Sequence, residues 1–209
     1  MKARTLVFVL VFCLLLGAMV WVQTPNPAAE TEAEDWFYPY ITESFRFGLT
    51  TGIMEDTGLN FHPHRNVTRA EFITMLGRLH EYSGTSVGPP DDSAFYARYL
   101  TWAVETGIFK GDLNGNLRLH SFITRQEMAL MLHRYITIYE LQEHFDFEAP
   151  PVAFHDWTDS APWAQEAVLA MGNYALMHGD EHAHFRPLDT TSRAEALAVL
   201  VRLGNILYG

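Results

Sequence analysis

The segment Val67-Thr68-Arg69-Ala70-Glu71-Phe72 decides the fold, because the chain contains two further versions of it. These read ITRQEM at 123–128 and TSRAEA at 191–196. Aligned on their hydroxyl residues, the three copies recur after 56 and then 68 residues. A recurrence of this kind indicates a chain assembled from copies of one small structural unit.

Each copy combines a hydroxyl residue with a glutamate three positions later. This spacing is that of a capping box, in which the hydroxyl accepts the amide hydrogen of the glutamate and the carboxylate accepts that of the cap residue. Apolar residues follow at helical spacing, so each copy predicts the start of a helix with one buried face. The three pairs are Thr68 with Glu71, Thr124 with Glu127, and Ser192 with Glu195.

A second helix is expected upstream of each capping box, over roughly 40–51, 95–106 and 163–174. Short Gly-Ile-type elements follow these helices, with sequences GIM at 52–54, GIF at 107–109 and ALM at 175–177. Gly- and Pro-rich stretches then separate the units. The sequence therefore predicts an all-α fold of three helix-loop-helix repeats packed together, because one such pair cannot bury both of its faces. The expected repeats are 36–82, 91–138 and 152–205.

The amino terminus is predicted to be an export signal. Lys2 and Arg4 precede an apolar run from Leu6 to Val22, and we assign 1–29 as a signal peptide, with an uncleaved membrane anchor as the alternative. Cys13 is the single cysteine, so the exported part contains no thiol for a disulfide, a nucleophile or a metal site. The net charge of −11 argues against nucleic acid as a partner.

The arginine inside each motif is not explained by helix capping. A cation in the first helical turn opposes the helix dipole at a cost of about 0.3 to 1 kcal/mol when exposed. Beside the backbone N–H groups of a helix start, however, a guanidinium supplies a two-pronged donor for carboxylate or phosphate. The pattern predicts an anion pocket formed three times, and Arg193→Ala is expected to weaken ligand binding while leaving the helix intact. The three arginines are Arg69, Arg125 and Arg193.

Taken together, these motifs resemble the S-layer homology (SLH) domain family. The resemblance is carried by VTRAE, ITRQE and TSRAE, by the GIM and GIFKG elements, by the turns FHP at 61–63 and FRP at 185–187, and by FHD at 154–156. It covers about residues 36–205. It implies a pseudo-threefold helical spindle, preceded here by the export signal, that acts without catalysis or cofactor.

The same resemblance implies a ligand and a location. SLH proteins bind secondary cell-wall polysaccharide on peptidoglycan, outside the cell in the wall or S-layer of a Gram-positive-type envelope. The motif arginines line grooves between repeats and contact acidic, often pyruvylated sugars, and Trp163 and Asp156 match the assisting residues in the third repeat. In the first two repeats, Tyr40 and Phe95 occupy the position expected for the tryptophan.

Other kinds of site are less well supported by the sequence. His178, His182 and His184 suggest a metal site, but an exposed loop explains them better, and no metal is expected. No carboxylate pairs with a histidine, a serine or a second acid at a spacing typical of catalysis, so the chain is not expected to be an enzyme. The alternative function is a membrane-tethered repeat protein whose arginines bind acidic side chains of another envelope protein.

Overall fold

The computed structural model describes residues 35–55, 58–112, 114–145 and 152–209. The predicted export signal therefore lies outside the described residues. The α-helices are α1 (Tyr38–Arg46), α2 (Arg69–Tyr82), α3 (Ala97–Glu105), α4 (Arg125–Ile138), α5 (Gln165–Asn173) and α6 (Arg193–Tyr208). Two short 3-10 helices are η1 (Leu141–His144) and η2 (Trp157–Asp159), and β1 (Ile53–Glu55) pairs antiparallel with β2 (Gly58–Asn60). Apart from this small hairpin, the predicted all-α fold is confirmed.

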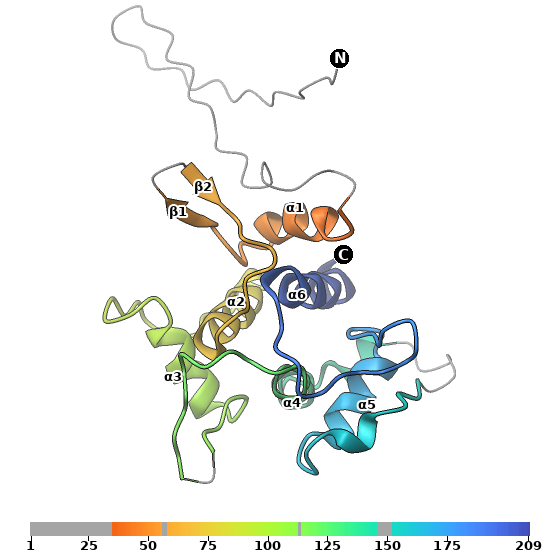
Figure 1. The fold of residues 1–209 in the computed structure, drawn as a ribbon. Coiled ribbons are helices and arrows are strands. Elements are labelled where there is room, and N and C mark those ends of the chain that lie inside the picture. Colours follow the sequence, from red (N-terminus) through yellow and green to blue (C-terminus); the bar gives the residue numbers. More distant parts are fainter. Residues whose placement is uncertain (1–34, 56–57, 113, 146–151) are drawn as a thin grey trace, which may run out of the picture.

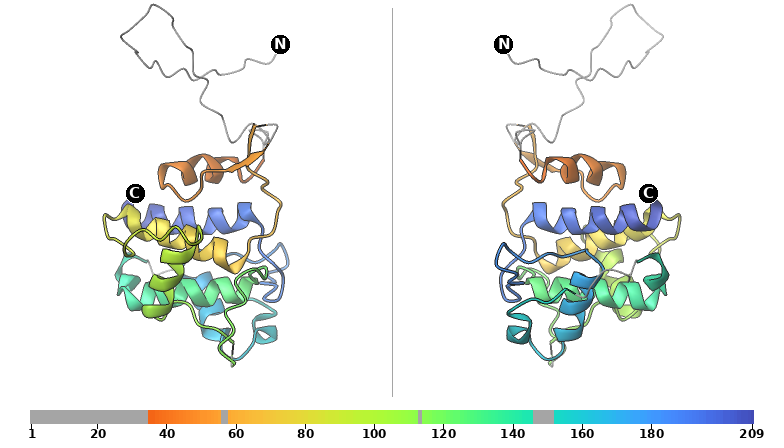
Figure 2. Two further views of the ribbon diagram at one scale, coloured as in Figure 1. Left: turned by 90° about the vertical axis from the view of Figure 1, so that its left-hand side faces the viewer. Right: turned by 90° about the vertical axis from the view of Figure 1, so that its right-hand side faces the viewer.

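The second helices of the three repeats form the centre of the molecule. Figure 1 shows α2, α4 and α6 in the middle, with α1, α3 and α5 arranged around them, and Figure 2 shows the central helices from the side. The predicted apolar stripe of each central helix is buried, which confirms the helical spacing read from the sequence. Its members are Phe72, Met75, Leu76, Leu79, Met128, Met131, Leu132, Tyr135, Ala196, Val199, Leu200 and Leu203.

Each outer helix packs against the central helix of a different repeat. The closest helix pairs are α3 on α2, α5 on α4, and α1 on α6. At the last of these pairs, a Cβ atom added to Gly204 would lie 2.8 Å from the ring of Phe47, so the glycine permits close contact between the two repeats. The first helix of every repeat thus packs against the second helix of the preceding repeat. The contact between α1 and α6 joins the first repeat to the last and closes the ring.

The three repeats meet at a triangle of backbone hydrogen bonds. The amide of Val67 donates to the carbonyl of Thr191 (2.9 Å), that of Thr191 to Ile123 (3.1 Å), and that of Ile123 to Val67 (2.9 Å). The three residues occupy the same position in their repeats, directly before the capping residue, and all three are fully buried. This closed triangle marks a pseudo-threefold axis, so the expected helical spindle is confirmed.

The ends of the outer helices correct one part of the sequence alignment. The residues directly after the C-caps of α1, α3 and α5 are Gly48, Gly107 and Ala175, all with positive φ. The element GIM at 52–54 is therefore not the counterpart of GIF, and that alignment was wrong. Gly48 precedes Thr68 by 20 residues, whereas the other two repeats have 17 between the same positions. The longer connection is the one that contains β1 and β2.

Within the described part of the chain, no helix combines the length and the apolar character of a membrane span.

Candidate functional site

All three predicted capping boxes are present. At the start of α2, the Thr68 hydroxyl accepts from the amide of Glu71 (3.3 Å), and the Glu71 carboxylate accepts from the amide of Thr68 (2.8 Å). In addition, Arg65 forms an ion pair with Glu71, and these contacts lower the pKa of this carboxyl despite the opposing effect of its burial. The same reciprocal capping occurs between Thr124 and Glu127 and between Ser192 and Glu195.

The remaining first-turn amides of the central helices are bonded by the next repeat. The amides of Arg69 and Ala70 donate to the carbonyls of Ser121 and Leu119, both at 3.0 Å. The expectation that these helix starts offer free backbone N–H groups to an anion is therefore wrong, because the neighbouring turn already satisfies them. Equivalent pairs join Arg125 to Asp189, Gln126 to Pro187, Arg193 to Arg65 and Ala194 to Pro63.

The guanidinium of Arg125 reaches across the junction between the second and third repeats. Its Nε donates to the carbonyl of Phe185 (2.6 Å), its Nη2 donates to the carbonyl of His178 (2.8 Å), and its carbon atom lies 4.8 Å from the centre of the Phe185 ring. Glu195 lies 3.9 Å from Nη1, beyond hydrogen-bond distance. Burial lowers the pKa of Arg125, and the charge of Glu195 opposes that shift.

Arg193 makes the same contact where the third repeat meets the first. Its Nε donates to the carbonyl of Phe61 (2.9 Å), its Nη2 donates to the hydroxyl of Thr50 (3.2 Å), and its guanidinium lies over the Phe61 ring. The residue is 4% exposed. Its side chain is therefore a structural connection between repeats as well as a candidate ligand contact.

Arg69 differs from the other two motif arginines. It forms an ion pair with Glu127 of the second repeat and lies over Phe109 at 4.9 Å from the ring centre. Its Nε is buried without a hydrogen-bond partner among the described residues. Because a carboxylate of the neighbouring repeat pairs directly with the charge of Arg69, this junction has less positive charge left for a ligand than the other two.

An exposed aromatic side chain precedes the N-cap residue of each outer helix. These residues are Trp36, Phe95 and Trp163, with 56%, 62% and 53% of their surface exposed. Trp36, and not Tyr40, is thus the counterpart of Trp163 in the first repeat. Tyr40 is half-buried against the core, and its hydroxyl accepts from Arg202 (3.3 Å). The sequence alignment missed Trp36 because it lies before the expected helix start.

Asp156 supports the turn before the third motif. Its two carboxylate oxygens accept from the backbone amides of Phe185 (2.6 Å) and Arg186 (2.7 Å). Both acceptor atoms are therefore engaged by backbone. The contact orients the turn that carries the carbonyl bonded by Arg125.

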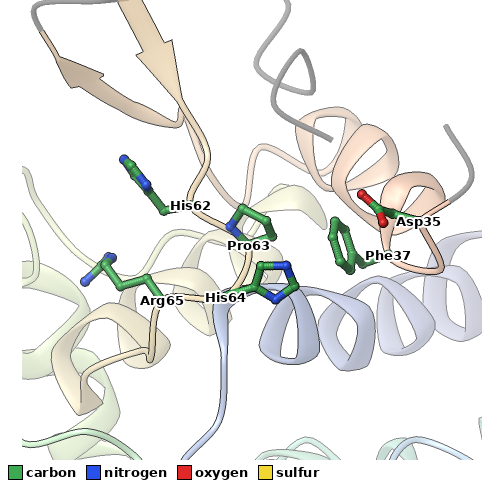
Figure 3. Close-up of a pocket in the computed structure, with 6 residues that line it drawn as sticks. All are labelled: Asp35, Phe37, His62, Pro63, His64 and Arg65. Carbon is green, nitrogen blue, oxygen red and sulfur yellow. The ribbon is translucent and has the colours of Figure 1, made fainter. Parts of the chain in front are cut away.

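A shallow pocket of about 340 Å³ lies where the turn of the first repeat meets the start of α1 (Figure 3). The rings of Phe37 and His64, which both line it, pack edge-on against each other with centroids 5.3 Å apart. The exposed ring of Trp36 packs edge-on against that of Phe37, with centroids 5.4 Å apart. The lining residues are Asp35, Phe37, His62, Pro63, His64 and Arg65.

The histidine-rich loop of the third repeat does not bring three metal-ligating groups together. The rings of His182 and His184 are 6.4 Å apart, and His184 lies 3.7 Å from Asp180. Among the residues that the structure describes, no cluster of three or more His, Cys, Asp or Glu side chains suits a metal ion.

Comparison with known proteins agrees with this architecture. The sequence profile of the S-layer homology domain matches residues 32–73, 89–129 and 153–197. An endoglucanase of Bacillus sp. (strain KSM-635) is 26% identical over 212 residues, which cover 96% of this chain and 22% of that protein. Cell surface glycoprotein 1 of Acetivibrio thermocellus is 29% identical over 157 residues, covering 68% of this chain and 7% of that protein.

The surface-layer 125 kDa protein of Lysinibacillus sphaericus is 29% identical over 119 residues, which cover 51% of this chain and 10% of that protein. The chain thus spans less than a quarter of the length of these relatives. The profile matches cover more than half of the chain, once for each repeat seen in the fold. The chain therefore belongs to the S-layer homology domain family, whose members include S-layer and cell-surface proteins that these domains anchor to the cell envelope.

Proposed function

We propose that the chain is a non-catalytic module that attaches to the cell wall of a Gram-positive-type envelope by binding anionic secondary cell-wall polysaccharide. The ligand is a polysaccharide linked to peptidoglycan, with acidic groups such as pyruvyl substituents. It binds without a metal or cofactor, at the surfaces where successive repeats meet. Export by the amino-terminal signal brings the module to this location.

The observation that carries the proposal is that each of the three repeats supplies both an exposed aromatic side chain and an arginine that reaches into the next repeat. Aromatic faces suit the apolar C–H surface of sugar rings, and an exposed tryptophan gains from being covered. A guanidinium attracts a carboxylate and donates charge-assisted hydrogen bonds to it. Trp36, Phe95 and Trp163 supply the aromatic faces.

Among the motif arginines, Arg125 is the best suited to attract an acidic sugar to its junction. Its Nε and Nη2 are fixed by backbone carbonyls, which hold the guanidinium in one orientation. Its Nη1 makes no hydrogen bond with the described residues and stands 3.9 Å from Glu195. Charge in a largely dehydrated setting acts more strongly on a ligand than charge in water, so an acidic group at this junction is favoured.

Co-sedimentation with cell-wall sacculi tests the proposal. The purified protein is mixed with intact sacculi and with sacculi from which the polysaccharide has been removed chemically. We expect the protein to pellet with intact sacculi and to stay in solution with stripped sacculi. A variant with Trp36→Ala, Phe95→Ala and Trp163→Ala tests the aromatic faces in the same assay, and its melting temperature is measured as a control for folding.

Equal pelleting with stripped sacculi, or none with either, contradicts the proposal. It favours the alternative in which the spindle binds another envelope protein and the amino-terminal segment remains as a membrane tether.

A further inference from the structure

Three residues at one equivalent turn position adopt a left-handed backbone conformation. They are His62, Arg118 and Arg186, with φ of 53°, 49° and 55°. Each follows the aromatic or apolar residue that starts its turn. This conformation is unfavourable for residues with a Cβ atom, and glycine or asparagine are the usual occupants. A strained position occupied each time by a side chain that can carry positive charge points to a role for that charge.

The left-handed conformation alone does not explain the basic side chains. Ala175 and Ala183 adopt it as well, with φ of 53° and 58°, and both are alanines. Glu140 adopts it too, with φ of 55°, and is acidic. A basic side chain is therefore not required by the left-handed conformation itself.

The turn position lies directly beside the motif arginines. Arg125 bonds the carbonyl of Phe185, the residue before Arg186. Arg193 bonds the carbonyl of Phe61, the residue before His62. The positive charge of Arg186 is close enough to lower the pKa of Arg125, after burial as the main cause. Two of the three junctions therefore pair an enclosed arginine with a basic residue next to it, towards the solvent.

Arg186 is accessible in a way that the motif arginines are not. Its side chain is 55% exposed, whereas that of Arg125 is 12% exposed. Its carboxylate neighbours Asp180 and Asp189 are 3.7 and 3.8 Å from Nε, longer than hydrogen bonds. Exposed pairs at such distances contribute little and exchange readily with another anion.

The backbone that carries this cation is held in place. Asp156 accepts from the amides of Phe185 and Arg186, which fixes the turn against the start of the third repeat. In the first repeat, His62 lines the same pocket as Asp35 and Phe37 (Figure 3). The exposed ring of Trp36 contacts that of Phe37, with centroids 5.4 Å apart. In the first repeat, the turn position therefore lies on the same pocket as the phenylalanine that contacts the exposed aromatic.

We propose that the residue at this turn position is the solvent-facing cation that contacts the acidic group of the bound polysaccharide, with Arg186 as the principal contact and Arg118 and His62 at the equivalent positions. This inference rests on the proposed function. The exposed guanidinium pairs with the ligand carboxylate, while the enclosed motif arginine behind it adds positive potential and holds the turn. The ligand then spans from this cation to the aromatic side chain of the same repeat.

Isothermal titration of isolated wall polysaccharide into four proteins tests the inference. These are the natural sequence, Arg186→Gly, Arg118→Gly and the control Ala175→Gly, which relieves the same backbone conformation without removing a charge. We expect Arg186→Gly to weaken binding at least fivefold and Arg118→Gly to weaken it less. Arg186→Gly should leave the melting temperature unchanged or raise it, because glycine accepts the left-handed conformation. The control should bind like the natural sequence.

Arg186→Lys separates charge from geometry. A lysine retains the positive charge but not the planar fork, so it should recover part of the affinity and part of its dependence on salt. If the natural sequence binds and Arg186→Gly binds equally well, the inference is wrong while the proposed function stands. If the natural sequence itself does not bind the polysaccharide, the proposed function fails.

Discussion

Arg193 and Phe61 are 132 residues apart, yet Nε of the arginine donates to the carbonyl of the phenylalanine at 2.9 Å. This contact joins the last repeat to the first, at the same side of the molecule where α1 packs on α6. The motif arginine is therefore part of the ring closure, and its removal affects more than a ligand.

Arg193→Ala should destabilise the fold. The substitution leaves the carbonyl of Phe61 and the buried hydroxyl of Thr50 without this donor, and it removes the cation that packs over the Phe61 ring. We expect the free energy of unfolding to fall by about 2–3 kcal/mol, measured by urea denaturation. This replaces the expectation that the helix start would be unaffected. Arg186→Ala, at an exposed side chain, is the matched control and should change stability by less than about 0.5 kcal/mol. Equal stability of the two variants would show that Arg193 does not support ring closure.

Thr191→Val should stabilise the protein. Thr191 is fully buried on the pseudo-threefold axis, and its Oγ1 has no hydrogen-bond partner within the described parts of the chain. Its two counterparts are Val67 and Ile123. Replacing an unpaired buried hydroxyl by a methyl group should raise the free energy of unfolding by about 1 kcal/mol. The reverse change Val67→Thr should lower it, and a loss of stability in Thr191→Val would contradict this account of the axis.

Ala175→Gly should also stabilise the protein, through the backbone alone. Ala175 follows α5 with φ of 53°, whereas Gly48 and Gly107 occupy the equivalent positions after α1 and α3. Glycine relieves the strain of the left-handed conformation at the expense of some unfolded-state entropy. The expected gain is about 0.5–1 kcal/mol by thermal or urea unfolding, whereas Gly107→Ala should produce a loss of similar size.

Stability should decrease in acid because of His80. This residue is 6% exposed, stacks on Trp102, packs at a tilt against Tyr139, and has its Nδ1 3.2 Å from the hydroxyl of Tyr135. Burial lowers the pKa of His80, against the opposing charge of Glu81. The unfolded chain therefore takes up the proton at higher pH than the folded protein does. The stabilisation is complete above the ordinary histidine pKa of about 6.5 and is lost as the pH falls below it.

His80→Phe tests this assignment, because it keeps an aromatic ring but cannot take up a proton. The slope of the unfolding free energy between pH 6.5 and about 4 should be shallower in the variant than in the natural sequence. Part of the slope should remain, since burial also lowers the pKa of His133 and His178. An unchanged slope would assign the acid sensitivity to these other histidines.

The sequence was sufficient to predict the features that depend on local spacing. Thr68 and Glu71 are three residues apart, and this spacing specifies a capping box wherever a helix begins. The buried apolar stripe of α2 was predicted from apolar residues that recur at the spacing of a helix. The packing of α1 on α6 could not be predicted in this way, because it depends on which faces meet after the chain closes. For the same reason, the sequence did not reveal that Ser121 and Leu119 cover the amides at the start of α2.

The candidate site was predicted in part. The motif arginines do reach into the junctions between repeats, but their near-complete burial is a result of tertiary packing. Trp36 was missed because the helix start was expected too late, and it became recognisable only when the N-cap of α1 was known. The basic residue in the turns FHP and FRP was present in the repeated pattern, but its left-handed backbone conformation is a property of the fold.

Tryptophan fluorescence during titration with isolated wall polysaccharide tests the central claim most directly. Trp36 and Trp163 are more than half exposed, whereas Trp102 is 6% exposed, so a ligand on the proposed surfaces must change the emission of the first two. We predict a saturable shift to shorter wavelength that disappears when the acidic substituents are removed from the polysaccharide and in the variant Trp36→Phe with Trp163→Phe. An emission spectrum that stays constant at saturating polysaccharide would contradict binding at the repeat junctions.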